Sequence, residues 1–166
     1  TWEIMNGGMP LTYNVGGANA KSPAISCSND GSLPFIYITY QIDNYGGYEE
    51  DYVLLSQFFN GVHRWTEFVS DMLPSYSYDT RPVVTGLNQF AMVVYKSAIS
   101  TPFVATEFKV NTAGNVLQII PRNFPAAYVN SSCGSPTITN GEGKYHLAYQ
   151  WGVFSIGYLR WSVYTD

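Results

Sequence analysis

The chain has 166 residues, the size of one domain that can bury its own core without metal ions or disulfides. Charged residues make up only 12% of it and aromatic residues 16%, which predicts a polar but weakly charged surface, unlike that of a typical cytosolic enzyme. The net charge is −4 and the eight basic residues are scattered, which excludes a phosphate-binding groove of clustered Lys and Arg, so we expect no direct contact with nucleic acid.

The amino-terminal stretch, residues 1–32, is rich in Gly, Asn, Ser and Pro. This composition predicts an irregular arm and loops, with a short strand near Trp2. Such an arm either lies across a partner or its own domain or is a flexible terminus, and the sequence leaves both open. Residues 33–166 are predicted to form a single β-sandwich domain.

The next segments are a predicted strand and a predicted helix. Apolar and polar residues alternate over Phe35–Ile42, which indicates a strand. Residues 48–60 favour a short helix, because acidic residues fill its first turn and apolar residues recur at helical spacing before Gly61. A strand over Tyr52–Phe59 is the alternative.

A strand is then predicted over Val62–Leu73, followed by a tyrosine-rich loop between Pro74 and Pro82. Tyr76 and Tyr78 of this loop are candidates for contact with a partner, because tyrosine offers a large rigid surface at low entropic cost. A simple connector is the alternative. A further strand is predicted over Gln89–Lys96.

The clearest local pattern is a hairpin over Thr101–Pro121. Phe103–Val110 alternates with period two, and Asn111–Asn115 holds residues that tolerate a reversal. Val116–Ile120 is predicted as the return strand, ended by Pro121 because proline cannot donate to a ladder.

The last third of the chain is predicted as a long polar loop, Asn123–Gly143, and two apolar runs over Lys144–Thr165 with a bulge or bend at Gly157. These runs are apolar on both faces, which is typical of the middle of a sheet or of an interface. The predicted fold is all-β: an antiparallel β-sandwich, jelly-roll-like, with about seven or eight strands and one short helix.

Cys27 and Cys133 are the only cysteines, and each lies in a stretch rich in Ser, Gly or Asn. They form one disulfide or stay as two thiols, and the sequence leaves both open. Asn130 begins an Asn-Ser-Ser triplet, a candidate glycosylation site of a kind that also arises by chance. The two histidines are far apart and no ligand-spaced motif or phosphate-binding glycine loop occurs, so we expect no metal and no cofactor.

Two residue groups suggest chemistry or binding. His63, with Asp71 and Asp79 downstream, is the best candidate for a hydrolase, although a histidine that packs beside Trp65 or faces solvent is the favoured interpretation. Trp65 and Trp151, together with the tyrosines, could stack on a sugar or an interface, although such residues more often belong to a core.

Three stretches carry a resemblance to a known family: LLSQFFNGVHRW (Leu54–Trp65), FAMVVYK (Phe90–Lys96) and EFKVNTAGNVLQIIPRNFP (Glu107–Pro125). They are similar to segments in capsid protein domains of picorna-like positive-strand RNA viruses, either the jelly roll or a projecting domain. The resemblance implies a structural, non-enzymatic coat domain in the virion, with other coat-protein copies as partners and a host receptor or glycan as a further one. It assigns no catalytic residue, because His63 is followed by Arg64 rather than by Ser.

Two other functions stay open beside this one. The first is a secreted carbohydrate-binding β-sandwich, and the second is a hydrolase that uses His63. No apolar run is long enough for a membrane span. The chain begins at Thr1 rather than Met, so we expect a proteolytic product or excised domain of a longer protein.

Overall fold

The computed structural model describes residues 19–28, 35–43, 51–70, 73, 81–97 and 101–163. Within these ranges the chain forms eleven β-strands and no helix. The strands are β1 (Asn19–Cys27), β2 (Phe35–Asp43), β3 (Tyr52–Phe59), β4 (Val62–Phe68), β5 (Val83–Leu87), β6 (Phe90–Lys96), β7 (Phe103–Val110), β8 (Val116–Arg122), β9 (Cys133–Gly141), β10 (Lys144–Trp151) and β11 (Ser155–Ser162).

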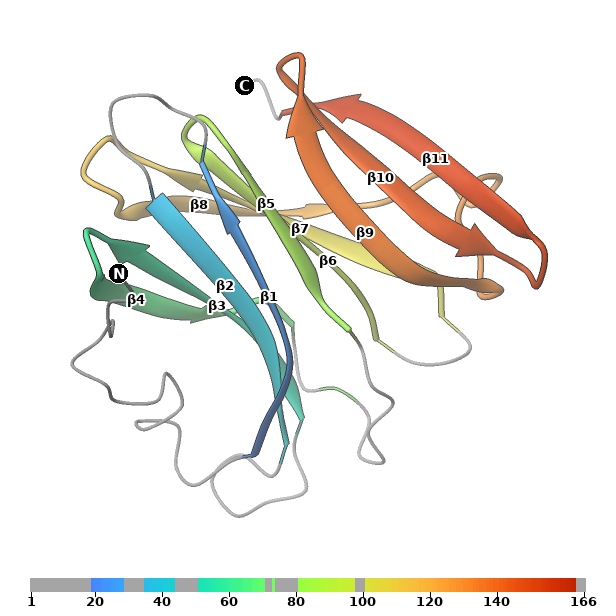
Figure 1. Cartoon of the computed structure of the whole chain (residues 1–166), viewed down its shortest axis with the longest axis horizontal. Coiled ribbons are helices and arrows are strands. Elements are labelled where there is room, and N and C mark those ends of the chain that lie inside the picture. The colour runs from blue at the N-terminus through green and yellow to red at the C-terminus, as the bar shows by residue number, and fades with distance from the viewer. Residues whose placement is uncertain are drawn as a thin grey trace, which may run out of the picture.

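The strands pair antiparallel in three sheets, each built from strands that follow one another in the chain (Figure 1). The amino-terminal sheet has the order β1-β2-β3-β4, the central sheet β5-β6-β7-β8, and the carboxy-terminal sheet β11-β10-β9. The prediction of an all-β antiparallel fold is confirmed. A jelly roll also pairs strands that are distant in the chain, and the described strands show no such pairing.

The central sheet is covered on both faces. One face packs against the amino-terminal sheet in a core that includes Val93 and Phe108, and the other packs against the carboxy-terminal sheet in a core that includes Val94 and Phe103. Successive residues of a strand point to opposite faces, so β6 can be apolar and buried almost throughout. The predicted strand Gln89–Lys96 is therefore confirmed as β6, one residue shorter.

The Thr101–Pro121 hairpin is confirmed as β7 and β8. Asn111 closes its turn, because its Oδ1 accepts hydrogen bonds from the backbone N–H groups of Ala113 and Asn115, both at 3.0 Å. The predicted stop at Pro121 is wrong, since β8 continues to Arg122. In the described strand order β8 is the edge of its sheet, a position where a proline is tolerated.

The helix predicted for residues 48–60 is wrong for the described part, because Tyr52–Phe59 forms β3 and the strand alternative holds. Six of its eight residues are buried, so both faces of the strand are apolar enough to imitate a helical pattern. Tyr48 and the rest of 44–50 lie outside the described residues.

The described strands also exceed the predicted seven or eight. Asn19–Cys27 forms edge strand β1 inside the predicted irregular arm, with a bulge between Lys21 and Ala24 that accommodates Pro23. Residues 1–18 and 29–34 lie outside the described residues. Cys133–Gly141, predicted as loop, forms β9, and β5 was not predicted. The predicted strand Val62–Leu73 ends earlier, at Phe68.

Candidate binding surfaces of the carboxy-terminal sheet

His63 lies on β4 and is exposed, with its ring edge against Phe58. Its Nε2 is 2.9 Å from Oγ1 of Thr66, which in turn is 2.7 Å from Oγ of Ser56. Among the described residues no carboxylate contacts the ring, and Asp71 and Asp79 lie outside them. The described contacts therefore bring His63 to hydroxyl groups but do not assemble a Ser-His-Asp arrangement.

Trp65 takes part in packing rather than in an open surface. The indole is half-buried, stacks on Phe108 at 6.3 Å between ring centroids and donates from Nε1 to the carbonyl oxygen of Gly114 at 2.7 Å. These contacts join β4 to β7 and to the turn between β7 and β8. Tyr76 and Tyr78 lie outside the described residues.

Cys27 is exposed at the end of β1, Cys133 is buried at the start of β9, and both thiols are free. Lys96 donates from Nζ to the backbone carbonyls of Ser131 and Cys133, each at 2.8 Å. Burial lowers the pKa of Lys96, and the nearby Cys133 opposes the shift.

The candidate glycosylation site lies in the same segment as Cys133. Oδ1 of Asn130 accepts a hydrogen bond from the N–H of Ser132 at 2.9 Å. The candidate acceptor side chain therefore helps to shape its own turn, and its modification stays a prediction.

Trp151 leads to the first candidate surface, which we call the hairpin tip: Val153, Phe154, Ile156 and Tyr158. Trp151 ends β10 and stacks on Tyr149 at 6.3 Å. The four residues of the hairpin tip follow it and are 61–97% exposed. Buried apolar side chains fill the opposite face of β11 and its neighbours, so this exposure is confined to the outer face and the turn. An apolar cluster of this kind marks an interaction site.

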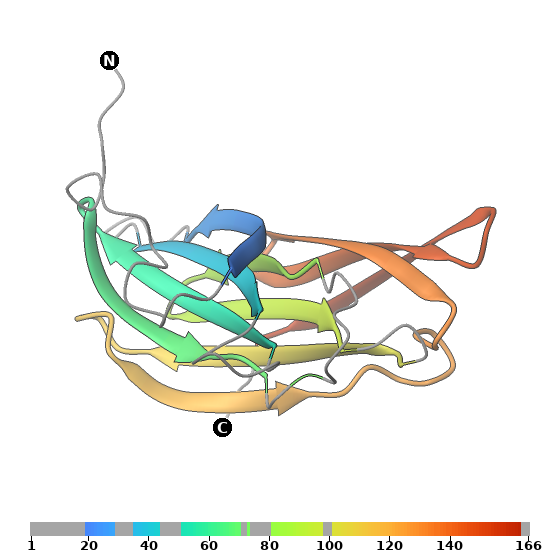
Figure 2. The same ribbon diagram turned by 90° about the horizontal axis from the view of Figure 1, so that it is seen from below.

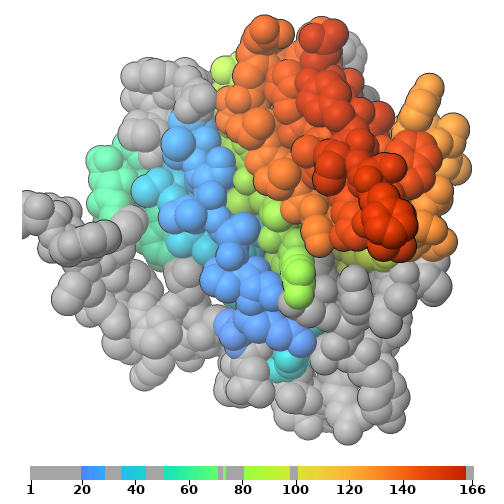
Figure 3. Space-filling view, turned by 45° about the vertical axis from the view of Figure 1, so that its right-hand side comes forward, coloured from blue at the N-terminus to red at the C-terminus, as the bar shows by residue number. Residues whose placement is uncertain are grey.

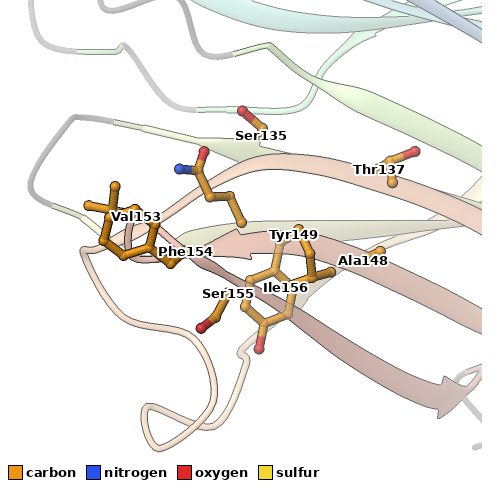
Figure 4. Close-up of a pocket in the computed structure, with 9 residues that line it drawn as sticks. Ser135, Thr137, Ala148, Tyr149, Val153, Phe154, Ser155 and Ile156 are labelled. Carbon is orange, nitrogen blue, oxygen red and sulfur yellow. The ribbon is translucent and has the colours of Figure 1, made fainter.

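The hairpin tip borders a shallow groove of about 450 Å³ on the outer face of the carboxy-terminal sheet. Figure 4 shows Val153 and Phe154 at one end of the groove and Thr137 toward the other. Ala148 and Ser135 also line it, so it offers hydroxyl groups and apolar carbon but no charged group among its lining residues. The space-filling view shows the sheet, orange to red, as one broad side of the molecule (Figure 3). The groove is suited to protein contact rather than to chemistry.

Glycine and tyrosine hold the hairpin together beneath its tip. Tyr149 pairs with Gly157 across β10 and β11, and its ring occupies the space where a Cβ of residue 157 would lie. The Tyr149 hydroxyl donates to the backbone carbonyl of Tyr128. Burial raises the pKa of Tyr149. The predicted bulge at Gly157 is absent, since the register of β10 and β11 is regular there.

A second candidate surface lies between β11 and the connector that follows β8, and we call it the arginine pocket. It has a volume of about 350 Å³, and two arginines, Arg122 and Arg160, line it together with Phe124, Tyr128 and Trp161. Phe124 and Trp161 meet edge to face at 5.3 Å. The pocket thus combines positive charge with aromatic surface.

Behind the pocket, Arg122 is oriented by a buried carboxylate. Its Nε donates to Oε2 of Glu107 at 2.9 Å, and its Nη2 donates to the same oxygen. Oε1 of Glu107 accepts a hydrogen bond from the hydroxyl of Tyr145 at 3.0 Å. Burial, and next the negative charge of Glu107, raises the pKa of Tyr145 well above its usual value. This network fixes the guanidinium at the pocket wall.

Within the described ranges, no three His, Cys, Asp or Glu side chains gather where they could hold a metal ion. No helix long and apolar enough to cross a membrane occurs among the described residues. Comparison with protein-family models, curated proteins and solved structures finds no match for the chain.

Proposed function

We propose that this chain is a structural coat-type domain of a non-enveloped RNA virus, that it is part of the virion, and that it works by associating with further copies of itself. The observation that carries the proposal is the hairpin tip, whose four apolar side chains are 61–97% exposed although the opposite face of the same sheet is buried in a core. The resemblance of the three sequence stretches to picorna-like capsid domains supports the same class of function.

A second copy of this chain is the occupant that best fits the hairpin tip. Ile156 and Tyr158 share one face of β11 and Phe154 lies in the turn just before it, so a two-fold axis near Ile156 brings Phe154 of one copy toward Tyr158 of the other. Aromatic side chains meeting in this way are typical of the centre of an interface. Arg160 lies beyond the apolar set, so the pairing does not oppose like charges at its centre.

Further exposed apolar residues supply another contact surface, as a coat requires. Val62 and Phe68 on β4, and Leu117 and Ile119 on β8, are 44–62% exposed. The two strands are edges of their sheets in the described strand order, and Figure 2 shows both at the lower left of the view, β4 in green and β8 in pale orange. Trp65 of β4 donates to the carbonyl oxygen of Gly114, in the turn that precedes β8. A subunit with apolar patches on two different sheets can contact more than one neighbour, which closed or extended assemblies need.

Sedimentation velocity over a concentration series tests the proposal. The wild-type chain is expected to gain mass with concentration, and Ile156→Thr is expected to shift the association to at least about tenfold higher concentration, since it removes a central contact. Ile25→Thr is the matched control, because Ile25 is 68% exposed on β1 and Ile156 is 78% exposed on β11. A monomeric wild type at every concentration, or equal effects of the two substitutions, would contradict the proposal.

A further inference from the structure

We propose that the arginine pocket binds a carboxylate-bearing sugar, such as a sialic or uronic acid residue at the end of a glycan. The proposal is independent of self-association, because it rests on different residues at the other end of β11. In the arginine pocket, Arg160 is the proposed cation, Tyr128 and Trp161 supply the aromatic surface, and Arg122 forms a rigid wall.

Charge is the first reason for an anionic ligand. Two arginines are among the residues that line the pocket, and Arg122 has a buried carboxylate beside it, since Glu107 is fully buried and accepts from Arg122. Among the described residues, Arg160 forms an ion pair with the exposed Glu142, at 3.9 Å, and such surface ion pairs are weak. A ligand carboxylate can replace Glu142 at Arg160 and form a charge-assisted, bidentate bond there.

The aromatic side chains are the reason for a sugar ring. Tyr128 is 52% exposed at the rim, and Trp161 is half-buried and held edge-on by Phe124. Flat aromatic faces with one polar edge suit ligands that have both an apolar face and hydroxyl groups. A pyranose ring presents C–H groups to such a face and directs its hydroxyl groups elsewhere.

The shape and backbone of the site favour a single sugar over a polyanion. The volume of about 350 Å³ is at the lower end of small-molecule sites. β11 is the edge of its sheet in the described strand order, so one row of its backbone groups is not paired to another strand and suits ligand hydroxyls. The net charge of −4 disfavours a long phosphate chain.

The ligand is tested by titrating the full chain, followed by the NMR signal of the Trp161 indole N–H. The probes are the methyl glycosides of sialic acid and glucuronic acid, with methyl glucoside, a sulfated galactoside and inorganic phosphate for comparison. The carboxylated sugars are expected to shift this signal in a saturable way, and methyl glucoside is expected to leave it unchanged.

Arg160→Gln is expected to weaken binding of the carboxylated sugars by about tenfold or more, the size of a lost charge-assisted bond. Arg64→Gln is the matched control, since Arg64 is an exposed arginine of the amino-terminal sheet and its loss changes the net charge equally. Tyr128→Leu is expected to weaken binding while the backbone carbonyl that accepts from Tyr149 stays in place.

Three outcomes would overturn the proposal: no saturable shift with either carboxylated sugar, equal binding of methyl glucoside, or equal losses in Arg160→Gln and Arg64→Gln. Equal binding of phosphate or the sulfated sugar would assign the pocket to anions in general and would reject the carboxylated sugar as its ligand. All titrations are repeated in the Ile156→Thr background, so that failure of the sugar site and failure of self-association are read separately.

Discussion

Tyr145 of β10 donates its hydroxyl to Oε1 of Glu107 of β7 at 3.0 Å, and this bond crosses the interface between the carboxy-terminal and central sheets. Glu107 is fully buried, and Arg122 supplies the opposite charge from the neighbouring strand β8. The network therefore satisfies both oxygens of a carboxylate that would otherwise be costly to bury.

Glu107→Ala is the first prediction. Removing the carboxylate leaves the buried Tyr145 hydroxyl without its acceptor and Arg122 without its counter-charge, so we expect a loss of about 3–5 kcal/mol in the free energy of unfolding. Urea denaturation followed by circular dichroism measures the loss. Glu142→Ala is the control, since Glu142 is 80% exposed and its pair with Arg160 is long, and it is expected to leave the midpoint unchanged. Equal midpoints for the two variants would show that the buried network does not stabilise the fold.

Gly157→Ala is the second prediction. The added Cβ overlaps the ring of Tyr149, so the ring must move away from β11 and lose its bond to the Tyr128 carbonyl. We expect the free energy of unfolding to fall by about 1–3 kcal/mol, the usual cost of overpacking. Gly134→Ala is a matched control on β9, because its Cβ would meet only Oε1 of Gln150 at 3.9 Å.

A double variant tests the cause of that loss. Tyr149→Leu shortens the side chain that the new methyl group meets, so in combination with Gly157→Ala it is expected to cost less than the sum of the two single changes. Thermal unfolding of the four chains gives the coupling. If the loss in the double variant equals the sum of the two single losses, Gly157→Ala destabilises the chain through the backbone rather than through the contact with Tyr149.

How far the sequence predicted the fold depends on how local each pattern was. The β7–β8 hairpin was predicted because its alternation and its turn residues lie within one short stretch. Tyr52–Phe59 was assigned to a helix because a strand buried on both faces has apolar residues at helical spacing as well. β1 and β9 were missed because Ser, Gly and Pro are weak strand formers, and pairing with β2 and β10 decides their conformation.

The candidate surfaces were predicted less well than the fold. The apolar character of both faces near Phe154 and Tyr158 predicted either the middle of a sheet or an interface; β11 is the edge of its sheet in the described strand order, and the interface stays a prediction. The arginine pocket carried no sequence signal, since Arg122 and Arg160 come together only through the path of the β8–β9 connector beside β11. Trp65 was a binding candidate by residue type alone, and only its contacts with Phe108 and Gly114 show that it packs.

Gly86→Ala is the third prediction, at the point where β5 meets both neighbouring sheets. A Cβ at residue 86 would lie 2.8 Å from backbone atoms of Ser28, while the Gly86 carbonyl accepts a hydrogen bond from Nδ2 of Asn140 at 2.6 Å. Backbone atoms cannot rotate away as a side chain can. We therefore expect the free energy of unfolding to fall by an amount near the upper end of the range of about 1–3 kcal/mol that is usual for overpacking.

Chemical denaturation measures the effect of Gly86→Ala, with Gly141→Ala as the comparison. The Cβ of residue 141 would make only ordinary contact, with Nε2 of His146 at 3.6 Å. A Gly86→Ala chain as stable as Gly141→Ala would mean that β1 and β5 can separate without cost.

The fourth prediction concerns alkaline pH. Burial raises the pKa of Tyr37 from 10.0 to about 12, while the hydrogen bond from Gln57 opposes this change. The pKa values of Tyr145 and Tyr149 are also raised. A tyrosine whose folded pKa is raised stabilises the fold fully below the unfolded pKa, and this stabilisation is lost as pH rises through the folded pKa. For Tyr37 alone the loss is roughly 2 kcal/mol by pH 12.

Lys96 acts in the opposite direction, because its lowered pKa means that the folded state gives up the proton first, so its contribution to stability rises as the pH approaches 10.5. Urea midpoints between about pH 8 and 12 separate the two effects, since the loss of stability from tyrosine ionisation is the larger effect only above about pH 10. Tyr37→Phe is expected to reduce the fall in stability above pH 10, although it lowers stability at neutral pH by removing the acceptor of Gln57. A wild-type chain whose midpoint stays constant from pH 10 to 12 would contradict the burial of all three hydroxyl groups, since an exposed tyrosine ionises alike in the folded and unfolded states.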